Sequence, residues 1–512
     1  MKRYILLTCI ISVFAIGWLV MATSAERGSK TRPQGELPRV LGIPSWTKLN
    51  INKISSWYRA NGEEERNPLN GNAGLTYPRG TSEVIFAAGL VWTGIHEDGR
   101  TPLLRTNGYS YNTGLKPGAI LGIRTGIAED LGAPDVRIFR IRRDYATADL
   151  RQDAAEINSI ALGSVNDGHI SAVRSQYAKD WTEWPWQKGA PFYDIGYLDA
   201  NGVDTVGANN RVLDWGEDAN RNGVLDAGED ANSNGKLDGE TPGLADADQV
   251  IWFVANDIAV QQPWTNIETG IELQTTVWGY ARADAIGDVL FKKYRLIYKG
   301  IAASSSDARI TNMYMAQWSD PDVGDSGNDF AGCDTNLSLG YAYNAHPTDP
   351  QYRDFNISPP AGGYDFLQGP LVRGNQGEDR NKNGIDDAID FGIFDLKLVG
   401  PGWINLPMTA FIYFAAGGTY SDPPFTAAGG IQWNQMLRGL PPTPGPPDPP
   451  PLINPTTGQP TSYWLSGDPV TGNGWIDGAL DQPGDRRIIL GSGPFTMALG
   501  DKHVLVSAFV GG

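Results

Sequence analysis

The chain has 512 residues, among them 63 Gly and 35 Pro, and a formal net charge of −17; this length predicts about two to four domains. A polyanion of this kind repels nucleic acid and anionic lipid and attracts cations, which excludes nucleic acid as a partner. Of the two cysteines, Cys9 lies in the first apolar run and Cys333 stands alone, so we expect no internal disulfide in an exported chain.

The first residues predict export. Lys2 and Arg3 precede an uncharged run, residues 4–22, and the small residues up to Ala25 close it before Glu26. This order is typical of a secretory signal peptide, residues 1–25. The alternative is an uncleaved membrane anchor, because the run is about long enough to cross a bilayer. No later run is apolar enough to do so, and we expect a secreted or cell-surface chain with no stable membrane insertion after cleavage.

Short runs of alternating or continuous apolar residues, divided by Gly, Pro, Asn and Asp, dominate the rest of the chain. The strand candidates, in order, are residues 84–92, 136–141, 250–254, 275–280, 289–298, 310–316, 408–414 and 504–510. One short helix is expected within 147–160, where apolar residues follow helical spacing. Many short strands between turn residues are typical of antiparallel β-sandwiches. We predict a mainly β chain with two or more antiparallel β-sandwich modules, jelly-roll or immunoglobulin-like, that carry inserted loops.

The composition divides the chain into regions. A β-sandwich region covers 37–180, an acidic segment 194–248, a second β-sandwich region 249–340 and a third β region 341–512. Residues 440–460 begin with a stretch too rich in Pro for helix or strand, which predicts an extended, solvated segment. It is either a linker or a long loop within one domain. We favour the loop, because too few strands follow it to form a stable domain.

The acidic segment repeats one phrase, Asp-x-Asn-x-Asn-Gly-x-Leu-Asp, which predicts calcium sites. Oxygen donors fall at the spacing of a calcium-binding loop, with Gly at the sharp turn. In the first copy the donors are Asp218, Asn220, Asn222, the carbonyl of Val224, Asp226 and Glu229. In the second they are Asp230, Asn232, Asn234, the carbonyl of Lys236 and Asp238, and Glu240 or a neighbouring carboxylate must complete a weaker site.

A third copy of the phrase lies in 378–390. Its donors are Asp379, Asn381, Asn383, Asp387 and Asp390. The first two copies abut and leave no room for the helices of an EF-hand pair, which excludes a calmodulin-like switch. The copies resemble thrombospondin type 3 repeats and other EF-hand-like loops, in which the ion replaces a hydrophobic core. We therefore expect two to four Ca²⁺ ions in calcium-binding loop insertions; the alternative is solvated acidic loops with Asn-Gly turns.

A fourth acidic cluster is shorter and less regular. Five carboxylates fall within 15 positions: Asp320, Asp322, Asp325, Asp329 and Asp334. Carboxylates this close repel one another unless a cation lies among them. The cluster is either a further calcium site or a turn-rich loop.

No catalytic signature stands out, so no catalytic residue is assigned. The chain lacks a His-Glu-x-x-His zinc motif, a Gly-x-Ser-x-Gly elbow and a phosphate-binding glycine loop. Sixteen Trp are many, and Trp181, Trp184 and Trp186 stand together. Such rings either stack on sugars or fill the core, and we favour the core.

Several phrases resemble a known group of proteins. The phrases VIFAAGLVWTG, DADQVIWFVAND, FKKYRLIYKG and QWSDPDVGDSGNDFAGCD are similar to those of uncharacterised, large secreted surface proteins of Gram-negative bacteria, many with a C-terminal type IX secretion sorting domain. The resemblance implies export, surface placement and β-sandwich modules, and no catalytic residues. Members usually continue past a strand like HVLVSAFVGG, so a chain ending at Gly512 is either truncated or a shorter member.

We expect a secreted, calcium-stabilised, non-enzymatic cell-surface or extracellular matrix and adhesion-type structural protein. One alternative is a carbohydrate-binding or glycoside-hydrolase-type protein with structural calcium. Another is a self-assembling surface-layer or fibre subunit. The expected partners are calcium, and beyond it polysaccharide, other surface proteins or further copies of the chain.

Overall fold

The computed structural model describes residues 45–194, 240–264, 267–374, 391–395 and 397–512. The predicted signal peptide and the predicted calcium loops 218–238 and 379–390 lie outside these residues. Within them the chain is mainly β, as predicted, and most strands belong to two large antiparallel sheets.

The first sheet has eight strands. Its order is β1-β2-β3-β4-β13-β24-β21, and β5 also pairs with β4. The bounds are β1 Trp46–Leu49, β2 Ser55–Arg59, β3 Leu75–Thr76, β4 Glu83–Glu97, β5 Leu104–Gly108, β13 Arg309–Pro321, β21 Ala410–Ala415 and β24 Arg486–Ala498.

The second sheet has nine strands, in the order β14-β15-β16-β25-β12-β11-β10-β6, and β7 also pairs with β10. The bounds are β6 Lys116–Pro117, β7 Phe139–Arg142, β10 Gln249–Asn256, β11 Ile271–Gly279, β12 Val289–Tyr298, β14 Asp329–Asp334, β15 Leu339–Asn344, β16 Ala361–Gln368 and β25 Lys502–Gly511. Four small ribbons complete the strands: β8 Phe192–Asp194 with β9 Glu240–Pro242, β17 Leu371–Arg373 with β20 Trp403–Asn405, β18 Gly392–Phe394 with β19 Lys397–Val399, and β22 Leu452–Ile453 with β23 Pro460–Thr461.

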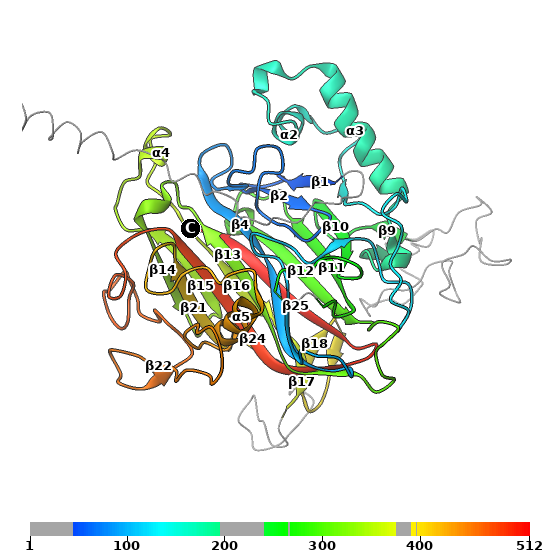
Figure 1. Ribbon diagram of the computed structural model, residues 1–512. Helices are drawn as coiled ribbons and strands as arrows, with labels where there is room; N and C mark the ends of the chain where they lie inside the picture. Colours follow the sequence, from blue (N-terminus) through cyan, green and yellow to red (C-terminus); the bar gives the residue numbers. More distant parts are fainter. Residues whose placement is uncertain (1–44, 195–239, 265–266, 375–390, 396) are drawn as a thin grey trace, which may run out of the picture. The chain divides into compact units, whose positions relative to one another are not determined.

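The main core draws on both large sheets, which Figure 1 shows as two sets of long strands. In β12, successive side chains alternate between buried and half-buried positions, so one face of the strand points into this core. In β4, by contrast, every residue from Val84 to Gly94 is buried. A continuously apolar strand of this kind must be covered on both faces.

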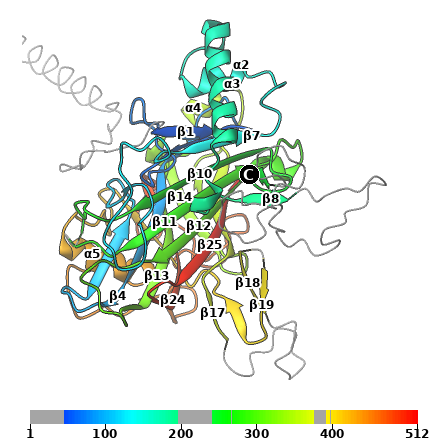
Figure 2. The same ribbon diagram turned by 90° about the vertical axis from the view of Figure 1, so that its right-hand side faces the viewer.

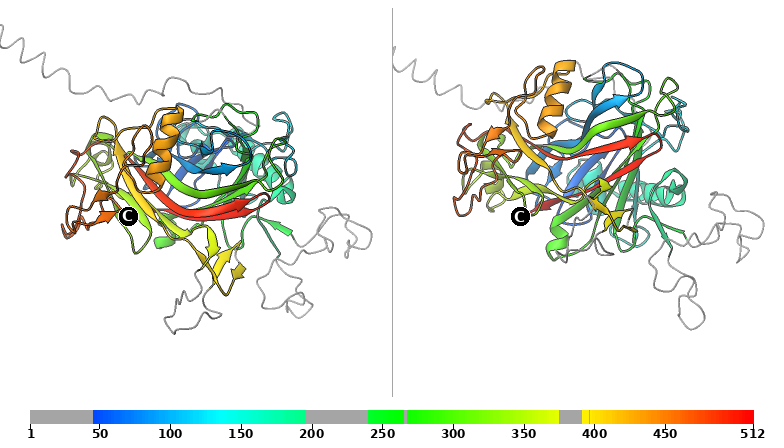
Figure 3. Two further views of the ribbon diagram at one scale, coloured as in Figure 1. Left: turned by 60° about the horizontal axis from the view of Figure 1, so that its bottom comes forward. Right: turned by 90° about the horizontal axis from the view of Figure 1, so that it is seen from below.

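Few helices accompany the sheets. They are α2 Arg151–Ile157, α3 Asp167–Thr182, α4 Pro350–Arg353 and α5 Ala427–Leu437. The helix expected within 147–160 is present as α2, and it packs with α3 at the upper end of the view in Figure 2. Helix α5 contacts β4, β5, β13, β21 and β24, and Figure 3 shows it lying across the first sheet. It therefore helps to cover the second face of the buried strand β4.

The three predicted β regions contribute strands to the same sheet. β4 comes from the first region, β13 from the second and β24 from the third, yet they are neighbours in the first sheet. The described residues accordingly belong to one compact unit. Strand neighbours this far apart in sequence leave no local signal, so a single sequence does not reveal their pairing.

Half of the Pro-rich stretch between Leu440 and Pro455 is exposed, Leu440 and Pro441 at its start are buried, and the short strand β22 is the only regular element in it. It lies between β21 and β24, which pair with each other. The stretch is therefore a long connection between two neighbouring strands of one sheet.

Candidate metal centre

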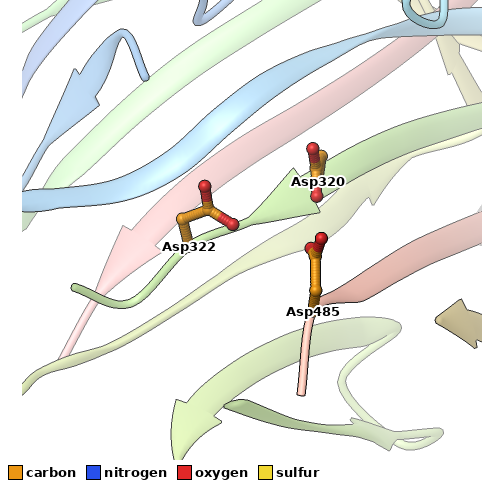
Figure 4. Close-up of side chains that lie close together, drawn as sticks. All are labelled: Asp320, Asp322 and Asp485. Carbon is orange, nitrogen blue, oxygen red and sulfur yellow. The ribbon is translucent and has the colours of Figure 1, made fainter. Parts of the chain in front are cut away.

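Three acidic side chains converge where β13 ends and β24 begins. Asp320 lies near the end of β13, Asp322 follows that strand directly, and Asp485 immediately precedes β24. The two strands are antiparallel, with Ser319 opposite Ile488, so the end of one lies beside the start of the other. One carboxylate oxygen from each aspartate lies within 4.8 Å of those of the other two. Figure 4 shows the three side chains approaching one another from these elements.

The cluster is shielded from solvent and tied to an arginine and a tyrosine. Asp320 is fully buried, Asp322 is buried, and Asp485 is half-buried. The Tyr111 hydroxyl lies 2.8 Å from Oδ2 of Asp320. Arg487 Nε donates to that hydroxyl over 2.7 Å, and its Nη1 lies 3.0 Å from Oδ1 of Asp485. These contacts tie Asp320 and Asp485 to the same guanidinium.

Several carboxylates surround the guanidinium of Arg487. Arg487 Nε also lies 3.6 Å from Oδ1 of Asp320 and 3.5 Å from Oδ1 of Asp422. Burial alone would lower the pKa of Arg487, but Asp320, Tyr111 and the other carboxylates raise it overall. Burial, and then the charge of Asp320, raise the pKa of Tyr111, which keeps its hydroxyl neutral. The carboxylates of Asp320, Asp422 and Asp485 therefore all lie within 3.6 Å of the Arg487 guanidinium, and carboxylates grouped in this way attract cations.

The donor set decides which cation fits. All three converging ligands are carboxylate oxygens, which suit hard cations such as Ca²⁺ and Mg²⁺ rather than metals that prefer nitrogen or sulfur. Three aspartates supply only part of the six to eight oxygens that Ca²⁺ takes, so water would complete the shell.

The fourth acidic cluster of the sequence is thus only partly brought together. Asp320 and Asp322 join the site, whereas the other three aspartates serve as local caps. The carboxylate of Asp325 accepts from Gly327 N over 3.0 Å, that of Asp329 accepts from Val323 N over 3.1 Å, and that of Asp334 accepts from Asn336 N over 2.9 Å. Sequence reasoning missed Asp485, which stands alone before its strand.

The other predicted ligands are not described. The donors in 218–238 and 379–390 lie outside the described residues, and Glu240 is described only as the first residue of β9. The structure therefore neither brings these donors together nor separates them.

The tryptophans favour the core interpretation. Across the described ranges, no Trp side chain falls among the exposed large apolar residues. Trp184 is buried against Phe139, and Trp181 and Trp186 are half-buried. Cys333 is also buried, its thiol 3.3 Å from the carbonyl oxygen of Trp464, and burial raises its pKa.

The chain matches no protein-family model, and no curated protein is significantly similar to it. Among the described residues, no helix combines the length and the apolar character that a membrane crossing requires.

Proposed function

We propose that the protein is a secreted, calcium-stabilised, non-enzymatic structural protein of the cell surface or extracellular matrix. The observation that carries this proposal is the threefold repeat of a calcium-ligand spacing, begun at Asp218, Asp230 and Asp379. Three independent copies of five or more oxygen donors around a turn glycine have a simple common purpose, which is to cage one ion each. The sequence resemblance to large secreted surface proteins agrees with this function.

The described fold adds two lines of support. The cluster of Asp320, Asp322 and Asp485 is an all-oxygen group that suits the same kind of ion. Its position between β13 and β24 would let an ion fasten two neighbouring strands at their ends. A chain with one buried free cysteine among its described residues has no disulfide there to do this.

A carbohydrate-binding function is less favoured. Such proteins present exposed aromatic rings to sugars, and the described Trp side chains are buried or half-buried. Nothing described favours a carboxylate pair in an open cleft for glycoside hydrolysis.

The proposal is tested by calorimetric titration of the full chain with CaCl₂ after treatment with EGTA. We expect two to four ions to bind, with dissociation constants of roughly 10⁻⁴ to 10⁻³ M, as in extracellular modules. At about 10 mM Ca²⁺, each occupied site would then stabilise the fold by roughly 1.4 to 2.7 kcal/mol. Identical unfolding temperatures in calcium and in EGTA would show that the acidic loops are merely solvated.

Variants separate the sites. Asp218→Ala and Asp379→Ala each remove the first ligand of a loop, and Asp485→Asn removes one ligand of the β13–β24 cluster. Each change is expected to remove one ion from the stoichiometry or to weaken its binding at least tenfold. Asp246→Asn is the matched control, because its carboxylate is 95% exposed and outside all these groups; it should bind calcium like the unaltered chain.

A further inference from the structure

A lysine and two glutamates are buried together between the two large sheets. Lys292 and Glu65 are fully buried and Glu64 is 1% exposed. Lys292 Nζ lies 2.9 Å from Oε2 of Glu64 and also contacts Oε1 of Glu65. Lys292 belongs to β12 of the second sheet, whereas Glu64 bridges β2 and β4 of the first. The three groups therefore connect the two layers of the fold.

Aromatic rings enclose the lysine. Its Nζ lies 5.0 Å from the ring centroid of Tyr364 and 5.7 Å from that of Tyr58, and both tyrosines are fully buried. The Tyr364 hydroxyl donates to Oε2 of Glu65, and the Tyr294 hydroxyl lies 2.7 Å from Oε2 of Glu64. Two buried tyrosine hydroxyls thus hold the two carboxyl groups in place beside the lysine.

The pKa values of Glu64 and Lys292 are both raised, which allows the two groups to exchange a proton. Burial, and then the adjacent Glu65, raise the pKa of Glu64, although Lys292 opposes the rise. Burial would lower the pKa of Lys292, but the two carboxylates raise it overall. One ammonium thus contacts two carboxyl groups, and one of them, Glu64, holds a proton more readily than an exposed glutamate does.

We propose that Lys292 and Glu65 become joined by an isopeptide bond, formed within the folded chain with Glu64 as the proton carrier. Nζ attacks Cδ of Glu65 and forms a C–N bond, while the bond from Cδ to Oε1 breaks. The ammonium gives up two protons to the departing oxygen, by way of the Glu64 carboxyl group, and one water molecule leaves. Oε2 becomes the amide oxygen and keeps its hydrogen bond from Tyr364. Glu64 ends as it began, and no oxidant, reductant or external reagent is needed.

Two physical arguments favour this reaction. Buried charges are costly to desolvate even when they are paired, and a neutral amide removes that cost. The fold also holds the amine and the carboxyl group in contact, which gives effective molarities of about 10⁵ M or more for well-oriented groups. Expulsion of the water product from an apolar core then favours the amide over the separated acid and amine.

Two consecutive lysines point to opposite faces of β12, so the second one provides a matched control for the test. Lys293 follows Lys292 directly, but it lies on the other face of β12, near Asp395. Lys293→Met should leave the crosslink intact, and Lys292→Met should abolish it. Glu64→Gln keeps both reacting groups but removes the proton carrier, so it should slow formation of the bond by about 10²-fold or more.

The decisive measurement is the mass of the denatured full chain, followed by a tryptic digest. We expect a mass lower by that of one water molecule and a branched peptide that joins Ala60–Arg66 to Ala283–Lys293, because trypsin does not cleave after an acylated lysine. Fragment ions should place the branch at Glu65. Recovery of Ala60–Arg66 and Ala283–Lys292 as separate, unmodified peptides overturns the proposal, as does loss of water elsewhere in the chain. Because this readout needs no variant to fold and no calcium to bind, it is independent of the proposed function.

Discussion

A buried histidine near the end of β4 predicts how stability depends on pH. His96 is 1% exposed and packs edge-on against Tyr298, with ring centroids 6.4 Å apart. Burial, and then the charge of Arg105, lower its pKa from 6.5 to about 3, although Asp98 acts in the opposite direction. The folded protein therefore keeps this ring neutral at a pH at which the unfolded chain takes up a proton.

The magnitude follows from linkage. Between pH 6.5 and about 3 the unfolded state binds more protons at His96, so the free energy of unfolding falls as the pH falls. Each pH unit in this window costs about 1.4 kcal/mol. From pH 7.5 to pH 5, about 1.5 units lie within the window, and His96 alone should remove about 2 kcal/mol of stability.

Guanidinium unfolding of the unaltered chain and of His96→Leu, at several pH values and constant calcium, isolates this contribution. Carboxylates and calcium sites titrate in both proteins, so their effects cancel in the difference. We compare the free energy of unfolding of the unaltered chain with that of the variant. Whatever this difference is at pH 7.5, it should be about 2 kcal/mol less in favour of the unaltered chain at pH 5. Parallel stability curves for the two proteins across this range would refute the reasoning.

Two further predictions concern other buried groups. Arg486 Nε and Nη2 lie 2.8 and 3.1 Å from the two carboxylate oxygens of the buried Asp477. Arg486→Met should therefore lower the free energy of unfolding, measured in urea, by about 3 to 5 kcal/mol, because it leaves a buried charge without its main partner. A loss below about 1 kcal/mol would contradict this, and the double change with Asp477→Leu should recover part of it. The buried thiol of Cys333 should resist iodoacetamide in the native protein and react after unfolding, as read by peptide mapping; rapid native labelling would mean that the core around it opens.

The strands that could be predicted are those whose pattern is local. The run 289–298 coincides with β12, and the run 84–92 lies within β4. β24 was not among the expected strands, since its Gly and Pro residues are typical of turns. In the structure Gly491 is needed inside the strand, because a Cβ there would lie 2.4 Å from the carbonyl oxygen of Leu437 in α5. Gly491, a residue type that usually ends a strand, here allows α5 to approach the first sheet closely.

The candidate metal centre was half predictable for a related reason. Asp320 and Asp322 were visible as part of a dense acidic cluster, but Asp485 joins them only through the pairing of β13 with β24. The same limit applies to Glu65 and Lys292, which are 227 positions apart and meet across two sheets. Single-sequence patterns identify which residues can do chemistry, whereas long-range pairing decides which of them meet.

The two proposals constrain each other in energy. In the chain-entropy model, a covalent link between positions 65 and 292 would stabilise the fold by about 5 kcal/mol, more than the roughly 1.4 to 2.7 kcal/mol expected for one calcium ion. A crosslinked chain can therefore lose its ions and keep its sheets together, with chelator effects concentrated near the ion sites. Without the link, as in Lys292→Met, the folded state has a smaller free energy of unfolding. Removal of the ions by EGTA should then bring unfolding into the range of conditions in which the protein works. If both inferences hold, the crosslinked, calcium-bound chain is the most stable form and the Lys292→Met chain in EGTA is the least stable. If the crosslink does not form, Lys292→Met does not show the loss expected from losing the link; if calcium does not bind, EGTA lowers the stability of neither chain.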